Sequence, residues 1–183
     1  WLRAIALLAV FACGVAPFLA VPVRRQQTSL SNSDALQKLG GAFDFLRTRQ
    51  AQDYAISTPN GIDQGKYLKI GGIEQWVTIR GEDLSNPVVL VLHGGPGDAT
   101  NPWGHAGFRA WLKAYTVVQW DQRGSGRTLG RNGRASAATL TIDRLVQDGV
   151  ELADALRISL RKDKIILLGH SWGSVLGAVM AKS

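Results

Sequence analysis

Residues 164–180, KIILLGHSWGSVLGAVM, join a short apolar run, a turn bounded by glycines and a second apolar stretch. The run from Lys164 to Leu168 has the length and composition of a strand that is buried on both faces. The small and apolar residues after Gly173 are typical of a buried helix. This order of strand, tight turn and helix places Ser171 in the turn itself.

The turn is Gly169-His170-Ser171-Trp172-Gly173, a G-x-S-x-G pattern between a buried strand and a helix. In that context the pattern predicts a nucleophile elbow, so we predict Ser171 to be the catalytic nucleophile. A helix N-terminus directs backbone N–H groups toward negative charge that develops on a substrate. The amide of Trp172 is therefore one predicted oxyanion-hole donor.

A second glycine-rich loop, His93-Gly94-Gly95-Pro96-Gly97, directly follows the apolar strand VVLVL at residues 88–92. A loop in this position supplies the other oxyanion donor, and its glycines admit close approach by a substrate. Gly94 and Gly95 are both candidates, between which the sequence does not choose. His93 is expected to orient this loop.

A third apolar strand, YTVVQW at residues 115–120, ends in Asp121-Gln122-Arg123-Gly124-Ser125-Gly126-Arg127-Thr128. Asp121 precedes the serine, whereas hydrolases with this elbow place the triad acid and histidine after it. We therefore predict a structural role for this segment, in which charges and glycines hold a tight loop beside the elbow.

The remaining pattern predicts an α/β fold with a mostly parallel sheet, an initial antiparallel hairpin and helices on both faces. The hairpin is expected from strands at 67–70 and 73–79 around Gly71-Gly72, and helices are expected at 108–114 and 142–160. The expected division is a membrane anchor or signal segment at 1–25, a polar connector at 26–64 and the N-terminal half of a hydrolase domain at 65–183.

Residues 5–23, IALLAVFACGVAPFLAVPV, are almost entirely apolar, and about 20 such residues cross a bilayer as a helix. We expect a single uncleaved membrane span, with export after signal cleavage as the alternative and the side of the membrane left open. In the connector, Leu36, Leu39, Phe43 and Leu46 recur at helical spacing and predict an amphipathic surface helix.

The chain carries a formal net charge of +7, but its Lys and Arg residues are dispersed along the sequence. Without a basic run interleaved with aromatic residues, nucleic-acid binding is not expected. Cys13 is the single cysteine, which excludes an intramolecular disulfide framework. No cofactor or metal is predicted.

HGGPG, DQRGSGRT and GHSWGS, in this order, resemble the proline iminopeptidase (prolyl aminopeptidase) branch of the α/β-hydrolase superfamily. The resemblance covers residues 66–183. It implies Ser171 as nucleophile and release of an N-terminal residue, typically proline, from a peptide through an acyl-enzyme. Relatives with similar motifs include esterases and amidases, so a small-molecule substrate is the alternative.

A serine hydroxyl needs a base, and none of the three histidines, His93, His105 and His170, has the position of a triad histidine. The twelve residues after Ser171 contain no Asp, Glu or His. We expect the triad acid and base to lie outside a chain that is truncated after the elbow and inactive alone. A non-catalytic membrane-bound remnant is the alternative from another class of protein.

Overall fold

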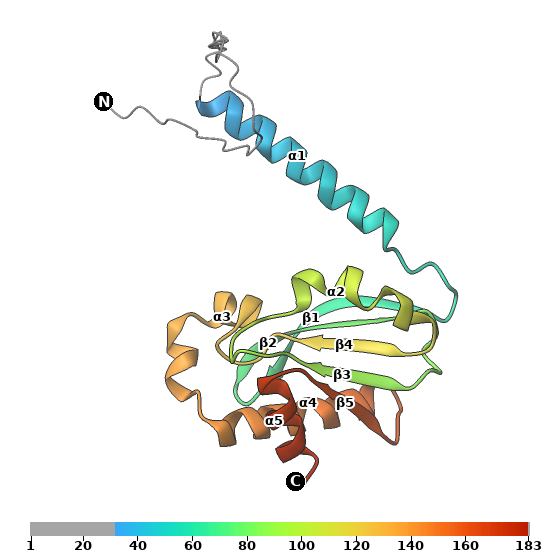
Figure 1. Ribbon diagram of the computed structural model, residues 1–183, viewed down its shortest axis with the longest axis vertical. Coiled ribbons are helices and arrows are strands. Elements are labelled where there is room, and N and C mark those ends of the chain that lie inside the picture. The colour runs from blue at the N-terminus through green and yellow to red at the C-terminus, as the bar shows by residue number, and fades with distance from the viewer. Residues whose placement is uncertain (1–31, 183) are drawn as a thin grey trace, which may run out of the picture. The chain divides into compact units, whose positions relative to one another are not determined.

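The computed structural model describes residues 32–182, and the predicted membrane segment 5–23 lies outside them. Among these described residues, no helix is both long and apolar enough to cross a bilayer. In chain order the elements are α1 (Asn32–Asp53), β1 (Ile62–Ile70), β2 (Ile73–Gly81), β3 (Val88–Leu92), α2 (Asn101–Gly107), the 3₁₀ helix η1 (Arg109–Lys113), β4 (Thr116–Trp120), α3 (Gly126–Asn132), the 3₁₀ helix η2 (Arg134–Thr139), α4 (Ile142–Ser159), β5 (Ile165–Gly169) and α5 (Trp172–Met180) (Figure 1).

The strands form one mixed sheet in the order β1-β2-β4-β3-β5. β1 and β2 make an antiparallel hairpin whose turn, Gly71-Gly72, has positive φ at both residues, as a tight two-residue hairpin turn requires. β2 is also antiparallel to β4, whereas β4, β3 and β5 are mutually parallel. The α/β class and the initial antiparallel hairpin are thus confirmed, but the described sheet is mixed rather than mostly parallel, because β2 also pairs antiparallel with β4 and only β4, β3 and β5 are parallel.

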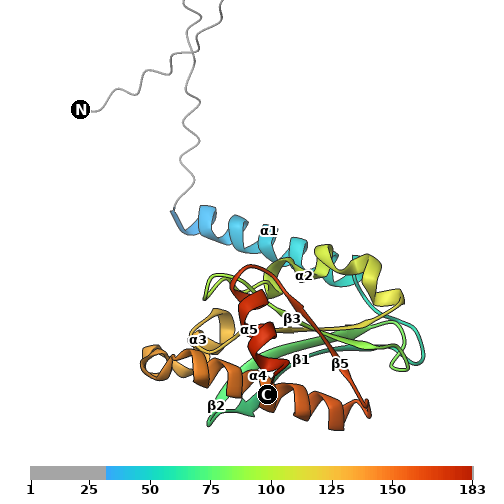
Figure 2. The ribbon, with the colours of Figure 1, turned by 60° about the horizontal axis from the view of Figure 1, so that its bottom comes forward.

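Helices cover the sheet on both faces (Figures 1 and 2). The alternation of side chains along β3 separates the two cores, because Val88, Leu90 and Leu92 join the larger cluster while Val89 and Val91 join the smaller one. The larger cluster includes side chains of α4 and α5, and the smaller cluster includes Leu112 of η1. Burial on both faces explains why β3 is a continuous apolar run.

The predicted elements differ from the observed ones in three places. The hairpin is longer than expected, since β1 begins at Ile62, which pairs with Gly81. The helix predicted at 108–114 is instead α2 followed by η1, which together occupy residues 101–113. The segment after Asp121 was predicted to be a loop, but its second half forms α3.

The helix predicted in the connector is present as α1, which runs across residues 43 and 44, where the chain divides into two compact units. The four apolar residues that recur at helical spacing along it are all exposed: Leu36, Leu39, Phe43 and Leu46. The sheet belongs to the second unit, residues 44–183.

Candidate active site

Ser171 occupies the turn between the end of β5 and the start of α5. Its φ of 53° and ψ of −119° lie outside the conformations that residues with a side chain normally adopt. Such strained backbone persists only where its surroundings impose it, and it is concentrated at functional sites. Ser171 is the N-cap of α5 and is exposed. The turn therefore presents this serine to solvent at the carboxyl edge of the parallel strands.

The two outer glycines of the elbow are required by close backbone contacts. A Cβ atom at Gly169 would lie 2.3 Å from the carbonyl oxygen of Gly173. A Cβ atom at Gly173 would lie 1.9 Å from the carbonyl oxygen of Leu92, at the end of β3. The G-x-S-x-G pattern thus reflects how tightly the start of α5 packs against β5 and β3.

The glycine-rich loop after β3 lies beside this turn. A Cβ atom at Gly94 would lie 3.2 Å from Nδ1 of His170 and 3.3 Å from Cβ of Ser171. Gly95 has a φ of 107°, and a Cβ atom there would meet the amides of Gly97 and Asp98 in its own loop. The structure therefore brings Gly94 next to Ser171, with Gly95 as the following residue.

Trp172 is the first residue of α5, where an α-helix leaves its amides without intrahelical carbonyl partners. Its amide directly follows Ser171, and the positive end of the helix dipole coincides with it. The elbow and the loop after β3 thus each contribute a residue with a backbone N–H group beside Ser171: Trp172 follows it in sequence, and Gly94 lies next to it in space.

His93 is buried at the base of the loop after β3. Its Nδ1 donates to the carbonyl oxygen of Gly94 at 2.9 Å, and its Nε2 accepts from the amide of Gln122 at 3.2 Å. Burial lowers the pKa of His93, opposed by the hydrogen bond to Gly94 and the charges of Asp121 and Asp98. The ring is therefore engaged on both nitrogens by backbone groups, in agreement with an orienting role.

The remaining histidines have different environments. His170 is exposed and adjoins Ser171, and its ring lies close to Gly94. His105 belongs to α2, and its side chain lies outside the described part of the structure. Within residues 32–182, no three His, Cys, Asp or Glu side chains are grouped to hold a metal ion.

Asp121 directly follows β4 and is buried. Its carboxylate accepts from Nδ2 of Asn101 at 2.5 Å and from the amide of Arg127 at 2.8 Å, at the start of α3. Its backbone carbonyl accepts from the hydroxyl of Thr128. These bonds join β4, α2 and α3, which is the kind of structural role predicted for this segment.

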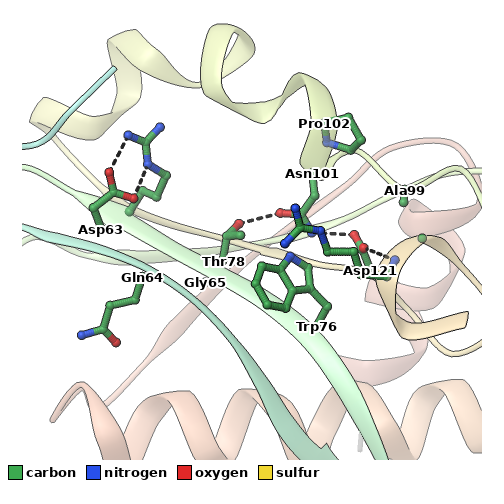
Figure 3. Close-up of a pocket in the computed structure, with 12 residues that line it drawn as sticks. Asp63, Gln64, Gly65, Trp76, Thr78, Ala99, Asn101, Pro102 and Asp121 are labelled. Atoms are coloured by element: carbon green, nitrogen blue, oxygen red, sulfur yellow. Dashed lines mark hydrogen bonds and ion pairs between the residues drawn. The ribbon is translucent and has the colours of Figure 1, made fainter. Parts of the chain in front are cut away.

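A cavity of about 510 Å³ is flanked by the hairpin and the start of α2, and its lining does not include Ser171 or Gly94 (Figure 3). Its polar groups are largely paired with one another. Thr78 donates to Asn101, which donates to Asp121, and Asp63 forms an ion pair with Arg80. The cavity and the elbow are thus separate features, and the predicted nucleophile Ser171 lies at the elbow.

Comparison with protein families gives a match to the alpha/beta hydrolase fold over residues 87–183. The probable aminopeptidase YbaC of Bacillus subtilis is 40% identical over 111 residues, which are 61% of this chain and 34% of that protein. A proline iminopeptidase of Heyndrickxia coagulans is 36% identical over 91 residues, 49% of this chain and 28% of the relative. The chain therefore spans about a third of the length of these curated relatives.

Solved structures give the same fold. A proline iminopeptidase-related protein from Thermus thermophilus superposes with a TM-score of 0.55 at 32% identity, covering 66% of this chain and 40% of the other. An epoxide hydrolase from Vigna radiata superposes with a TM-score of 0.52 at 29% identity, over 66% and 34% of the two chains. Proteins of different named activities thus share this scaffold.

Proposed function

The chain belongs to the α/β-hydrolase fold family, and from this premise we propose that its gene product is a serine hydrolase with Ser171 as nucleophile. The observation that carries the proposal is the strained backbone of Ser171, held at the N-cap of α5 beside Gly94. A side chain on such a turn is exposed to an incoming carbonyl group while the adjacent amides face the same place.

In the proposed reaction, the Oγ atom of Ser171 attacks the carbonyl carbon of the substrate and forms a tetrahedral intermediate. The negative charge on the former carbonyl oxygen is stabilised by the amide of Trp172 and by that of Gly94 or Gly95. Collapse of the intermediate expels the leaving group and produces an acyl-enzyme, which water then hydrolyses. No step of this reaction requires a metal ion or an organic cofactor.

We propose that the triad acid and base lie outside these 183 residues. His93 uses both ring nitrogens for backbone contacts with Gly94 and Gln122. His170 adjoins Ser171 in the same turn, and its ring lies close to Gly94. A polypeptide of the 183 residues alone is accordingly proposed to be inactive.

The substrate proposed is a peptide with N-terminal proline, from which the enzyme releases the prolyl residue. Support comes from the three motifs and from relatives named proline iminopeptidase and probable aminopeptidase. An esterase or amidase on the same scaffold is the alternative; that the scaffold carries different activities is supported by a solved neighbour that is an epoxide hydrolase. A non-catalytic membrane-bound remnant is the alternative of another class.

Kinetics of the complete gene product distinguish these functions. We expect turnover of a prolyl anilide with kcat/KM well above that of a short-chain ester, and loss of both activities in Ser171→Ala. Ser159→Ala, at the exposed end of α4, is the control and should retain full activity. Ester turnover without anilide turnover would favour the alternative enzyme, and equal activity in Ser171→Ala would refute a serine nucleophile.

For localisation, we propose a membrane anchor formed by residues 5–23, with export after signal cleavage as the alternative. An uncleaved span resists extraction by alkaline carbonate and leaves residues 1–25 on the mature protein. N-terminal sequencing that begins after residue 20 would exclude the anchor and support cleavage.

A further inference from the structure

Gln122, the second residue after β4, holds His93 at two points. Its backbone amide donates to Nε2 of the His93 ring at 3.2 Å. Its side-chain Nε2 donates to the backbone carbonyl oxygen of His93, also at 3.2 Å. Both residues are buried, so solvent does not compete for these bonds. The loop after β4 thus fixes the first residue of the loop after β3.

The bonds around the His93 ring are mutually consistent with a neutral imidazole. A carbonyl oxygen can only accept, so the contact with Gly94 places the ring proton on Nδ1 and leaves Nε2 as the acceptor for the Gln122 amide. The hydroxyl of Ser125 lies 3.1 Å from the same Nε2 and donates to the carbonyl oxygen of Gln122 at 2.7 Å. Ser125 therefore closes the loop after β4 around the ring.

The amide of Gln122 has one orientation that fits this contact, because its oxygen cannot face the carbonyl oxygen of His93. Its Oε1 is buried and has no hydrogen-bond partner among the described residues. A leucine or methionine would fill the same space without leaving that acceptor buried, so packing does not explain an amide here. What the amide supplies is the donor to His93.

We propose that Gln122 is a positioning residue of the oxyanion loop, acting through His93 on Gly94. The inference rests on the proposed function, since it assigns a role within the oxyanion hole of Ser171. Gly94 directly follows His93 and lies against the elbow, so a displaced His93 carbonyl group moves Gly94 relative to Ser171. Gln122 does not touch the substrate in this arrangement.

The test compares Gln122→Met, which keeps the length of the side chain and removes the donor, with Gln75→Met. Gln75 is also buried, and its amide bonds join Ile70 and Trp120 in the region of the hairpin. Both variants of the complete gene product are assayed with an oxygen ester and the matching thionoester, whose sulfur is a weak hydrogen-bond acceptor. The rate ratio of the two esters reports on hydrogen bonding to the oxyanion.

In Gln122→Met we expect kcat for the oxygen ester to fall about tenfold to a hundredfold with KM unchanged, since one oxyanion donor is worth about 10²–10³ in kcat. The thionoester should lose less, so the ratio contracts. Gln75→Met should keep the wild-type ratio even if it lowers Tm. If Gln122→Met kept the wild-type ratio of oxygen-ester to thionoester rates, the inference would be overturned. Turnover that depends on Ser171 would still support the proposed function in that case.

Two further measurements test the inference if Gln122→Met does not fold or if the wild type shows no turnover. If Gln122→Met does not fold, Gln122→Leu, which also removes the donor, replaces it and should contract the ratio in the same direction; an unchanged ratio there overturns the inference. If the wild type shows no Ser171-dependent turnover, the proposed function fails. The amide NMR signal of Gly94 then decides, because it should shift in Gln122→Met and not in Gln75→Met, and an unmoved signal overturns the inference.

Discussion

Gly173 lies where the first turn of α5 passes over the end of β3. Because a Cβ atom there would be 1.9 Å from the backbone carbonyl oxygen of Leu92, the contact cannot be relieved by a side-chain rotation. Gly130, in α3, has no atom within 4 Å of the corresponding position. Substitution of the two glycines therefore separates the effect of the close contact between α5 and β3 from the general effect of glycine in a helix.

We expect Gly173→Ala to lower the free energy of unfolding by about 3 kcal/mol or more, at the upper end of overpacking effects. Gly130→Ala should be neutral or stabilising by up to about 1 kcal/mol, because alanine is the better helix former. Urea denaturation measures both values. A Gly173→Ala variant as stable as Gly130→Ala would contradict the packing described for the elbow.

The protonation of His93 gives a second test at the scale of the residue. Burial lowers its pKa below the ordinary 6.5, so the unfolded chain binds a proton first as the pH falls. The stability that the fold gains from keeping the His93 ring neutral is fully present above pH 6.5. It is lost as the pH drops from there through the pKa of His93 in the folded state.

The Tm of the wild type should therefore fall more steeply as the pH is lowered below 6.5 than that of His93→Asn, which carries no titrating ring. The comparison cancels the contributions of other groups that titrate in both proteins. Parallel Tm curves for the two proteins would show that His93 is not buried as a neutral ring.

Among the elements, a buried ion pair joins the hairpin turn, the loop after β4 and helix α4. Asp148 of α4 is fully buried and accepts from Arg123 at 2.7 Å and from Arg144 at 2.9 Å. Arg123 also donates to the backbone carbonyl of Gly71 in the hairpin turn. Loss of the Asp148 charge would leave two guanidinium groups close together, one of them buried.

We predict that Asp148→Asn lowers the free energy of unfolding by about 3–5 kcal/mol, the usual effect of breaking a buried pair. Glu74→Gln is the matched control, because the Glu74–Arg131 pair is about half exposed and should contribute at most about 1 kcal/mol. Thermal or chemical denaturation of the two variants gives the comparison. Equal losses would mean that Asp148 is not a central contact between these elements.

The sequence predicts the buried strands well and the polar elements poorly. β3 and β4 are apolar runs because helices cover both faces of the sheet. β5 was expected to be equally buried, but at the edge of the described sheet none of its residues is fully buried and Ile166 is exposed. The first residues of β1, Asp63 to Gly65, are exposed and polar, and only their backbone pairing with β2 makes them a strand. α3 has few apolar residues and follows a glycine-rich turn, so its composition indicated a loop.

The contacts of Gln122 and Ser125 with His93 could not be predicted from the sequence either. They depend on how the loop after β4 folds against the loop after β3, which the pairing of these two strands alone does not determine. The positions of Ser171 and Gly94 were easier to predict, because each directly follows a recognisable apolar strand.

At the scale of the molecule, β5 forms the edge of the described sheet and pairs only with β3 within residues 32–182. Ile166, in the middle of β5, is 46% exposed. An apolar edge strand with unpaired backbone groups is a template for association with another chain.

A polypeptide of these 183 residues should therefore self-associate at micromolar concentration, and Ile166→Lys should reduce the association, because lysine discourages edge pairing. Ile158→Lys is the control, since it removes an exposed apolar side chain from α4 rather than from the strand. Sedimentation velocity measures the distribution of species. Equal reduction by both variants would assign the association to general apolar surface.

The central claim, that the elbow presents Ser171 as a nucleophile, is tested most directly by mapping a fluorophosphonate adduct on the complete gene product. Trypsin cleavage after Lys164 and Lys182 yields a peptide that contains both Ser171 and Ser174, so fragmentation compares two exposed serines of one peptide. We expect a stoichiometric adduct on Ser171 and none on Ser174. An active enzyme without an adduct on Ser171 would contradict that claim.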